Sequence, residues 1–320
     1  MVDVFAEVPA DFCKRFAVNS PVQHVDYKSA AEILEALPPG KIISSGGGAA
    51  NTAKIAAFLG IPTAFIGAVG SDPFGLLFEE ELRQAGVRLH LARKKSPTGV
   101  FISLISKNTK AGSTGSSRHI VASPSAALEL NAADLDEKLF ECRDDVPQLL
   151  FLEGFLLDRE KLIDRILELA ATYKLGLAID SGTADIAAEQ ARRIQQGTSP
   201  FPDRTLRAGK FPLMLFMNEK EAEAFSGVYN AGWENLFIEA SKDSSVMAAV
   251  KLAERGAVIF SGGRLYRAKT KPVKAAESTG TGDAFAAGFL ASWLQNNGPL
   301  QCGQAGNTAA AMVLKAPGTG

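Results

Sequence analysis

The strongest constraint on the fold is a regular alternation of strand-like and helix-like segments in the middle of the chain. The alternation predicts strands over 148–152, 175–180 and 212–217 and helices over 158–173, 184–196 and 219–226. Strands that alternate with helices form right-handed crossovers, so the strands lie parallel in one sheet. Ligands of such sheets bind beyond the carboxyl ends of the strands. This rule places Glu153, Asp180 and Asn218 on one rim of the molecule.

The N-terminal third follows a different pattern. Residues 1–8 are predicted as a strand in which Asp3 stands among apolar neighbours. Two interpretations of Asp3 remain open, because it either faces outward at the two-residue period of a strand or contacts a ligand at the strand end. Short β-like runs between 87 and 121 surround a glycine- and serine-rich piece, which predicts a hairpin or flap. A flap suits a reaction that must exclude water.

A glycine-rich turn joins a predicted strand over 41–45 to a helix of small residues. The turn is Gly46-Gly47-Gly48-Ala49-Ala50-Asn51, and Asn51 emerges one turn into the helix, where its amide can donate and accept hydrogen bonds. The glycines either bind a ligand or only permit close packing of helix on strand. Their spacing is not the G-x-G-x-x-G of a dinucleotide site, although Asp72 stands about 20 residues further on, as in that fingerprint.

A second glycine-rich turn, Gly280-Thr281-Gly282-Asp283, leads into an apolar-periodic helix over 284–294. Gly280 and Gly282 allow backbone conformations that are closed to residues with a Cβ, so several N–H groups can point into one small space. The first-turn N–H groups and the dipole of the helix add to the attraction for a phosphate. Asp283 either contacts the group that attacks this phosphate or caps the helix.

Asn218 and Glu221 are three residues apart at the start of a predicted helix and therefore lie on one face. An amide with carboxylates beside a phosphate site suggests water-mediated handling of Mg²⁺, which prefers oxygen ligands and keeps its waters. The alternative is a capped helix with acidic residues that favour its N-terminus.

The last predicted helix, 300–315, follows strands over 247–252, 257–260 and 264–268 and the second glycine-rich turn. It is rich in glycine and alanine, which we interpret as room for a flat group to lie against it.

Composition excludes several classes of protein. With 320 residues, 46% of them hydrophobic, the chain can bury a full core without disulfides. The formal net charge is −1 and the basic residues are scattered, which argues against a nucleic-acid partner. The three cysteines are far apart and predict neither a disulfide framework nor a zinc site. No apolar run approaches the ~20 residues of a membrane span and nothing resembles a signal peptide, so we expect a cytoplasmic protein without a membrane partner.

Taken together, these motifs resemble the PfkB/ribokinase family of ATP-dependent carbohydrate and nucleoside kinases. The resemblance spans nearly the whole chain and rests on four motifs in order: Gly46-Gly47-x-x-x-Asn51, Gly67 to Asp72, Asn218-x-x-Glu221, and Ser278 to Asp283. The chain departs from the family pattern at five positions. Glu277, Ser278 and Thr281 replace Asp, Thr and Ala of the last motif, while Lys251 stands where a threonine is common and Ala253 where a nucleotide-binding glycine is common.

The resemblance implies a doubly wound α/β fold with a mostly parallel sheet, as one domain over 1–320. A small β lid would be formed by parts of 10–45 and 90–122. It implies that Asp283 is the general base for a primary hydroxyl, beside an anion hole of Gly280, Thr281 and Gly282. The implied substrate contacts are Asp3, Gly46, Gly47 and Asn51. The implied contacts to the co-substrate ATP are Asn218, Lys251, Ala253, Gly256 and Asn307. Mg²⁺ would be held through water by Asn218 and Glu221.

Two other functions compete with this interpretation. A nucleotide-binding oxidoreductase would use Gly46-Gly47-Gly48 for NAD and Asp72 for its ribose, but it leaves the Ser278–Asp283 motif unexplained. A catalytically inactive sugar- or nucleoside-binding protein is the third possibility, and an intact Asp283 argues against it. Within the kinase interpretation the acceptor is a sugar or a nucleoside. The N-terminal third and the Glu153-Gly154-Phe155 stretch resemble the adenosine-kinase-like branch, and the chain is a monomer or a homodimer.

Overall fold

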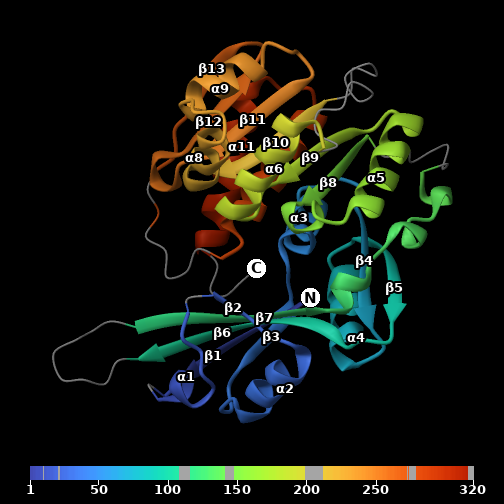
Figure 1. Cartoon of the computed structure of the whole chain (residues 1–320), viewed down its shortest axis with the longest axis vertical. Coiled ribbons are helices and arrows are strands. Elements are labelled where there is room, and N and C mark those ends of the chain that lie inside the picture. Colours follow the sequence, from blue (N-terminus) through green and yellow to red (C-terminus); the bar gives the residue numbers. More distant parts are fainter. Residues whose placement is uncertain are drawn as a thin grey trace. The chain divides into compact units, whose positions relative to one another are not determined.

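The computed structural model describes residues 1–9, 11–20, 22–107, 116–140, 148–198, 212–271, 273 and 279–315. The chain divides into two compact units (Figure 1). The first contains Met1–Phe58 and Pro62–Leu130, and the second contains Leu59–Ile61 and Asn131–Gly320. The single domain and the lid over parts of 10–45 and 90–122 stay predictions.

The first unit is built on a five-stranded mixed sheet. Its strand order is β2 (Val22–His24), β7 (Ser116–Ser125), β6 (Thr98–Lys107), β1 (Val2–Val8) and β3 (Ile42–Ser45). Strand β1 lies between β6 and β3 and runs parallel to β6 and antiparallel to β3. The predicted hairpin is the antiparallel pair β6 and β7, of which residues 108–115 lie outside the described part of the chain.

Helices and a parallel strand pair complete this unit. They are α1 (Phe12–Arg15), α2 (Tyr27–Ala36), α3 (Gly48–Phe58), β4 (Ala64–Gly70), α4 (Pro73–Gln84), β5 (Arg88–Lys94) and the short 3₁₀ helix η1 (Ala126–Glu129). The apolar residues Val2, Val4, Ile33 and Ile102 belong to one buried core. Burial of such side chains, at roughly 1.5–3 kcal/mol each, holds the helices to the sheet.

The second unit is built on a six-stranded sheet. Its strand order is β13 (Arg264–Ala268), β12 (Ala257–Ser261), β11 (Val246–Lys251), β10 (Leu213–Asn218), β9 (Gly176–Asp180) and β8 (Leu149–Glu153). The strands β8 to β11 are parallel, whereas β12 and β13 are antiparallel. The predicted strand–helix alternation is therefore confirmed to within two residues at each end.

Helices cover both faces of this sheet. They are α5 (Glu160–Tyr173), α6 (Ala184–Gln196), α8 (Glu219–Gly227), α9 (Trp233–Ala240), α10 (Thr281–Leu294) and α11 (Pro299–Lys315), with the 3₁₀ helices η2 (Ala132–Asp134), η3 (Glu137–Leu139), η4 (Gly154–Leu156) and η5 (Ala253–Arg255). In β12, Ile259 joins a core with Phe285 and Phe289 of α10, whereas the next residue, Phe260, contacts Trp233 and Phe237 of α9. Successive residues of a strand point to opposite faces, so the sheet is doubly covered.

In the part of the chain that the structure describes, no helix has the length and apolar character needed to cross a membrane.

Candidate functional site

Asp3 lies on β1, between β6 and β3 of the first unit's sheet, with its carboxylate against the Gly46 turn. It is paired with Ser44 of β3 and Phe101 of β6, and it is buried. A Cβ at Gly46 would lie only 2.0 Å from Cγ of Asp3, so the carboxylate fills the space that any side chain at position 46 would need. The burial of Asp3 excludes the outward-facing interpretation.

The same turn positions Gly47 and Asn51. Gly47 has a φ of 97°, which side chains with a Cβ rarely adopt, and it lies immediately before α3. The backbone N–H of Asn51 donates to the carbonyl of Gly47 at 2.9 Å. The four residues expected to bind substrate therefore lie on one strand, on the turn that precedes α3 and in the first turn of α3: Asp3, Gly46, Gly47 and Asn51.

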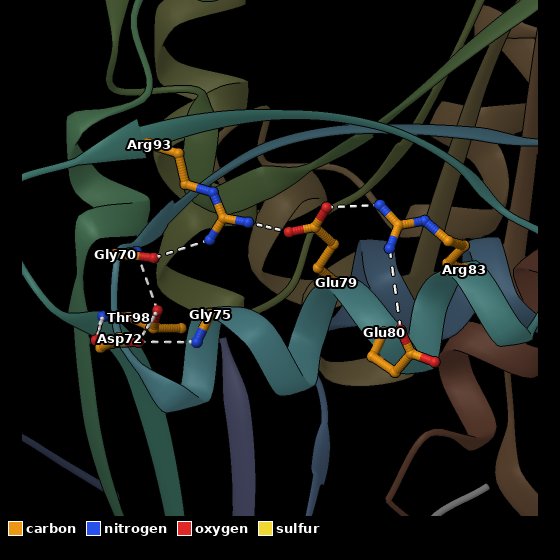
Figure 2. Close-up of polar contacts among 8 residues, drawn as sticks. All are labelled: Gly70, Asp72, Gly75, Glu79, Glu80, Arg83, Arg93 and Thr98. Atoms are coloured by element: carbon orange, nitrogen blue, oxygen red, sulfur yellow. Dashed lines mark hydrogen bonds and ion pairs between the residues drawn. The ribbon is translucent and has the colours of Figure 1, made fainter.

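Asp72, the acid of the oxidoreductase alternative, is engaged within the chain. Its carboxylate caps α4 by accepting from the N–H of Gly75 at 2.8 Å. It also accepts from the N–H of Thr98 at 2.6 Å and from the Thr98 hydroxyl at 2.7 Å. Figure 2 shows this network together with the contacts of Arg93 to Gly70 and Glu79. The contacts of Asp72 and Thr98 join α4, β4 and β6. They favour a structural role for Asp72 and argue against its binding the ribose of NAD.

In the second unit, the predicted rim is the edge formed by the carboxyl ends of the parallel strands. Glu153 ends β8 and is paired with Asp180 at the end of β9, while Asn218 ends β10 and is paired with Lys251 at the end of β11. The rule that located these residues from the sequence is confirmed, and the edge carries Lys251 in addition.

Asn218 and Glu221 form a capping box at the start of α8. The Asn218 side chain accepts from the Glu221 N–H at 3.0 Å, and the Asn218 N–H donates to Glu221 Oε2 at 2.8 Å. Burial raises the pKa of Glu221, against the opposing effects of the Asn218 N–H and the Lys251 charge. The helix-cap interpretation is therefore realised, and an additional role toward Mg²⁺ stays a prediction.

No three His, Cys, Asp or Glu side chains converge as a metal-binding group within the described ranges. A buried and held carboxylate beside an amide fits an outer-shell role, since Mg²⁺ usually keeps several of its waters and binds few protein ligands directly.

Lys251 forms an ion pair that the sequence did not predict. Its ammonium donates to Asp180 Oδ2 at 2.6 Å, and both side chains are less than a fifth exposed. Burial alone would lower the pKa of Lys251, but the carboxylates of Asp180, Glu221 and Asp283 outweigh it and raise that pKa above its ordinary value. The ammonium is therefore charged at neutral pH. Asp180 and Lys251 both end strands of one sheet, but the strand order that brings them together is not contained in any local sequence pattern.

The turn before α10 has Gly280 as its N-cap, with a φ of 77°. Asp283 is the third residue of the helix, so it does not occupy the N-cap position that the capping interpretation requires. The expectation that Gly282 needs a special backbone is wrong, because it lies within the helix and has no positive φ. Its missing side chain instead leaves room beside Lys251, whose Nζ would be 3.3 Å from a Cβ at position 282.

The remaining predicted nucleotide contacts lie near the ends of β11 and β13. Ala253 has a φ of 51°, a left-handed backbone that explains why glycine is common at this position in the resembled family. Gly256 has a φ of 90° and packs against the carbonyl of Ala268. The buried Asn307 donates its amide to that same carbonyl at 2.9 Å. These contacts give Gly256 and Asn307 a structural role, while their nucleotide contacts stay predictions.

The small residues of α11 serve packing between elements. A Cβ at Gly306 would lie 2.8 Å from the Phe285 ring, and one at Gly303 would lie 2.3 Å from Ile259. On α10, a Cβ at Gly288 would lie 2.7 Å from Ala309. The interpretation that α11 leaves room for a flat group is therefore wrong, because α10 and the sheet occupy that room.

Glu277 and Ser278, which begin the last motif, lie outside the described residues.

Comparison with known proteins agrees with this arrangement. Adenosine kinase 2 of Arabidopsis thaliana is 26% identical over 293 residues, which cover 86% of this chain and 79% of that protein. Adenosine kinase of Saccharomyces cerevisiae is 29% identical over 318 residues, covering 91% and 85%. The crystal structure of adenosine kinase from Sinorhizobium meliloti has a TM-score of 0.78 at 23% identity, covering 99% of this chain and 91% of that chain, and shows the shared fold. The family model described as "pfkB family carbohydrate kinase" matches residues 41–320, and the chain therefore belongs to the pfkB family of carbohydrate kinases.

Proposed function

We propose that the chain transfers the γ-phosphate of ATP to a primary hydroxyl group of a sugar or nucleoside. The observation that carries this proposal is the turn at the start of α10, where Gly280 caps the helix in a left-handed conformation and Asp283 follows in the first turn. First-turn N–H groups of a helix have no intrahelical acceptor and attract anions. A turn suited to binding phosphate and a carboxylate are thus combined within four residues, which supports the proposal.

The acceptor would be held by the Asp3 and Gly46 cluster of the first unit. A buried carboxylate accepts hydrogen bonds from two neighbouring hydroxyl groups, and the amide of Asn51 can donate or accept. Since Gly46 is in contact with Asp3, the turn fixes where that carboxylate lies. This contact supports a role for Asp3 in binding a polyol, because the carboxylate is held in one position.

In the transfer step, the substrate hydroxyl oxygen attacks the γ-phosphorus of ATP. A new P–O bond forms to the acceptor, the bond from the γ-phosphorus to the β–γ bridging oxygen breaks, and ADP leaves. Asp283 takes the hydroxyl proton, and the backbone N–H groups of Gly280, Thr281 and Gly282 stabilise the charge on the phosphate oxygens. Phosphoryl transfer depends mainly on such positioning and charge stabilisation.

Mg²⁺ is expected to accompany ATP, with Glu221 and Asn218 acting on it through water. When bound, the ion neutralises charge on the phosphates. Glu221 is buried, and its hydrogen bond to the Asn218 N–H holds its carboxylate in place. This supports the role, because the carboxylate is fixed at the edge of the sheet where β11 ends with Lys251.

The test is an assay of ADP release with ATP and Mg²⁺ against ribose, fructose, adenosine and other nucleosides. We expect at least one acceptor to be phosphorylated, and mass spectrometry should show one added phosphate. The analogue of that acceptor without its primary hydroxyl should inhibit and should not react. Phosphate found on another hydroxyl, or ADP release with no phosphorylated product, would contradict the proposal.

EDTA supplies the metal control, because turnover that survives chelation would refute the Mg²⁺ requirement. The cytoplasmic location and the choice between monomer and homodimer stay predictions.

A further inference from the structure

Lys251 occupies a place in the second unit where the resembled family commonly has threonine. It ends β11 beside Asn218 of β10, and its side chain reaches past β10 to Asp180 at the end of β9. An ammonium has three N–H donors, and the hydrogen bond to Asp180 uses one of them. The Asp180 carboxylate is itself fixed, because it also accepts from the Gly182 N–H at 3.1 Å. The ammonium is therefore held in one position.

That position borders the phosphate-binding turn. The Nζ atom would be 3.3 Å from a Cβ at Gly282, so no side chain separates the ammonium from the helix start at this point. The charges of Glu221 and Asp283 also act on Lys251, which places it among three carboxylates with Asp180. A polyanion that approached those carboxylates without a cation would be repelled.

We propose that Lys251 contacts the phosphate groups of ATP at the Gly280–Asp283 turn, with Asp180 as the residue that positions it. This inference rests on the proposed kinase function. It refines the expected contact of Lys251 to ATP, because it names the phosphate groups as the part that is bound and Asp180 as the positioning residue. A threonine in the same place would offer a hydroxyl without charge. Lysine supplies a point charge that is suited to phosphate. Because Asp180 already holds the ammonium in place, the protein does not need to reorganise when charge develops on the phosphate.

The experiment compares binding and turnover in Lys251→Met, Lys251→Thr and Lys251→Arg. Calorimetry measures the Kd of ATP and of AMP, and the coupled assay measures kcat. We expect Lys251→Met to weaken ATP binding by about 10-fold or more, as for loss of a hydrogen bond to a charged group, while the Kd of AMP changes less than about 3-fold. Its kcat should fall by about 10²-fold, as for loss of one anion-hole donor. Lys251→Arg should retain more of the ATP affinity and more of the kcat than Lys251→Thr does.

Lys242→Met is the matched control. It removes the same charge from an exposed ion pair with Glu239, also in the second unit, and should leave the ATP-to-AMP preference and kcat unchanged. Asp180→Asn tests positioning, because it keeps a hydrogen-bond acceptor without the charge. It should lower kcat, and it should have little further effect once Lys251 is Met.

The outcomes separate this inference from the proposed function. If the wild type transfers phosphate but Lys251→Met and Lys251→Thr keep its ATP-to-AMP preference and kcat, the Lys251 contact is wrong and the kinase proposal stands. If the wild type phosphorylates no acceptor, the kinase proposal fails. The ratio of the ATP and AMP affinities then still decides whether Lys251 contacts phosphate. Should Lys251→Met not fold, the Thr and Arg variants give the same comparison.

Discussion

Each unit has one turn that contains glycine and aspartate and leads into a helix. The two turns differ in where the aspartate stands relative to the first residue of its helix. In Gly70-Ser71-Asp72 the aspartate is the N-cap of α4, and its carboxylate binds Gly75 and Thr98. In Gly280-Thr281-Gly282-Asp283 the glycine is the N-cap of α10 and the aspartate is three residues further. An aspartate at an N-cap is used by the helix itself, whereas one in the first turn can face a ligand that the helix start attracts. From this difference we predict a structural role for Asp72 and a catalytic role for Asp283, although Glu221 shows that an acid in the first turn can also serve its own helix.

The largest effect should follow from Asp283→Asn. Asparagine keeps the size and hydrogen-bonding capacity of the side chain but cannot accept the substrate proton, so kcat should fall by about 10²–10⁴-fold. The melting temperature should change little, and the Kd of ATP should stay the same or fall slightly because a negative charge leaves the phosphate site. The variant is compared with wild type by steady-state kinetics, calorimetry and thermal melting. A normal kcat would place Asp283 with Asp72 as a structural acid.

Asp72→Ala should show the opposite pattern. It removes a helix cap, worth about 0.5–2 kcal/mol, and leaves the N–H and hydroxyl of Thr98 without their acceptor, at about 1–3 kcal/mol. The free energy of unfolding should fall by roughly 2–4 kcal/mol in total, while kcat per folded molecule is retained. Denaturant unfolding and the kinase assay at low temperature test this. A large loss of kcat in fully folded protein would mean that Asp72 is not merely structural.

Replacing Asp3 tests the carboxylate that lies in a strand instead of at a helix start. Asp3→Asn should weaken acceptor binding by roughly 1.5–3 kcal/mol and spare ATP binding, because a hydrogen bond to a charged group is lost. Asparagine keeps the volume beside Gly46, which makes it a gentler change than alanine. Calorimetry with the acceptor found in the assay provides the measurement. Equal acceptor affinity in the variant would assign Asp3 to the fold alone.

The smallest effect concerns two residues in left-handed backbone. Gly280 has a φ of 77° and Ala253 a φ of 51°, and an L-residue in that region costs roughly 1–2 kcal/mol. Gly280→Ala should therefore lower the free energy of unfolding by about 1 kcal/mol. Ala253→Gly should leave it unchanged or raise it by a few tenths of a kcal/mol, since the extra freedom of glycine in the unfolded chain offsets part of the relief. Thermal melting of both variants provides the measurement. If the melting temperature fell in both variants or rose in both, this account would be contradicted.

Much of the second unit could be predicted from the sequence because local signals agree there. The alternation over 148–226 gave its strands and helices, and the rule for parallel sheets located Asp180 and Asn218 at one edge. The pair of Asp180 and Lys251 was missed because it depends on the order of three strands, β9, β10 and β11, which no local pattern contains. The small residues of α11 were misinterpreted for the same reason, since their neighbours come from α10 and β12.

The first unit was predictable mainly at its turns. The strand of residues 1–8 and the turn at Gly46 were found, but the contact between Asp3 and Gly46 was not, because it depends on the register of β1 against β3. For Asn218 and Glu221 the sequence left a choice, and the capping box shows that the helix-cap alternative is present in the structure. A local motif therefore located these residues, and only tertiary packing could show what each of them contacts.

The pairing of β1 with β6 has a consequence for how the chain is made. Val2 lies opposite Val100, so β1 leaves the ribosome well before its parallel partner and must wait for it. At about 5–20 residues per second, this delay lasts several seconds to tens of seconds. During that time β1, a mainly apolar strand with Asp3 near its start, has unpaired backbone groups, although β3 can reach it earlier. A nascent chain halted before residue 98 should therefore bind chaperones, and one released past β7 should not.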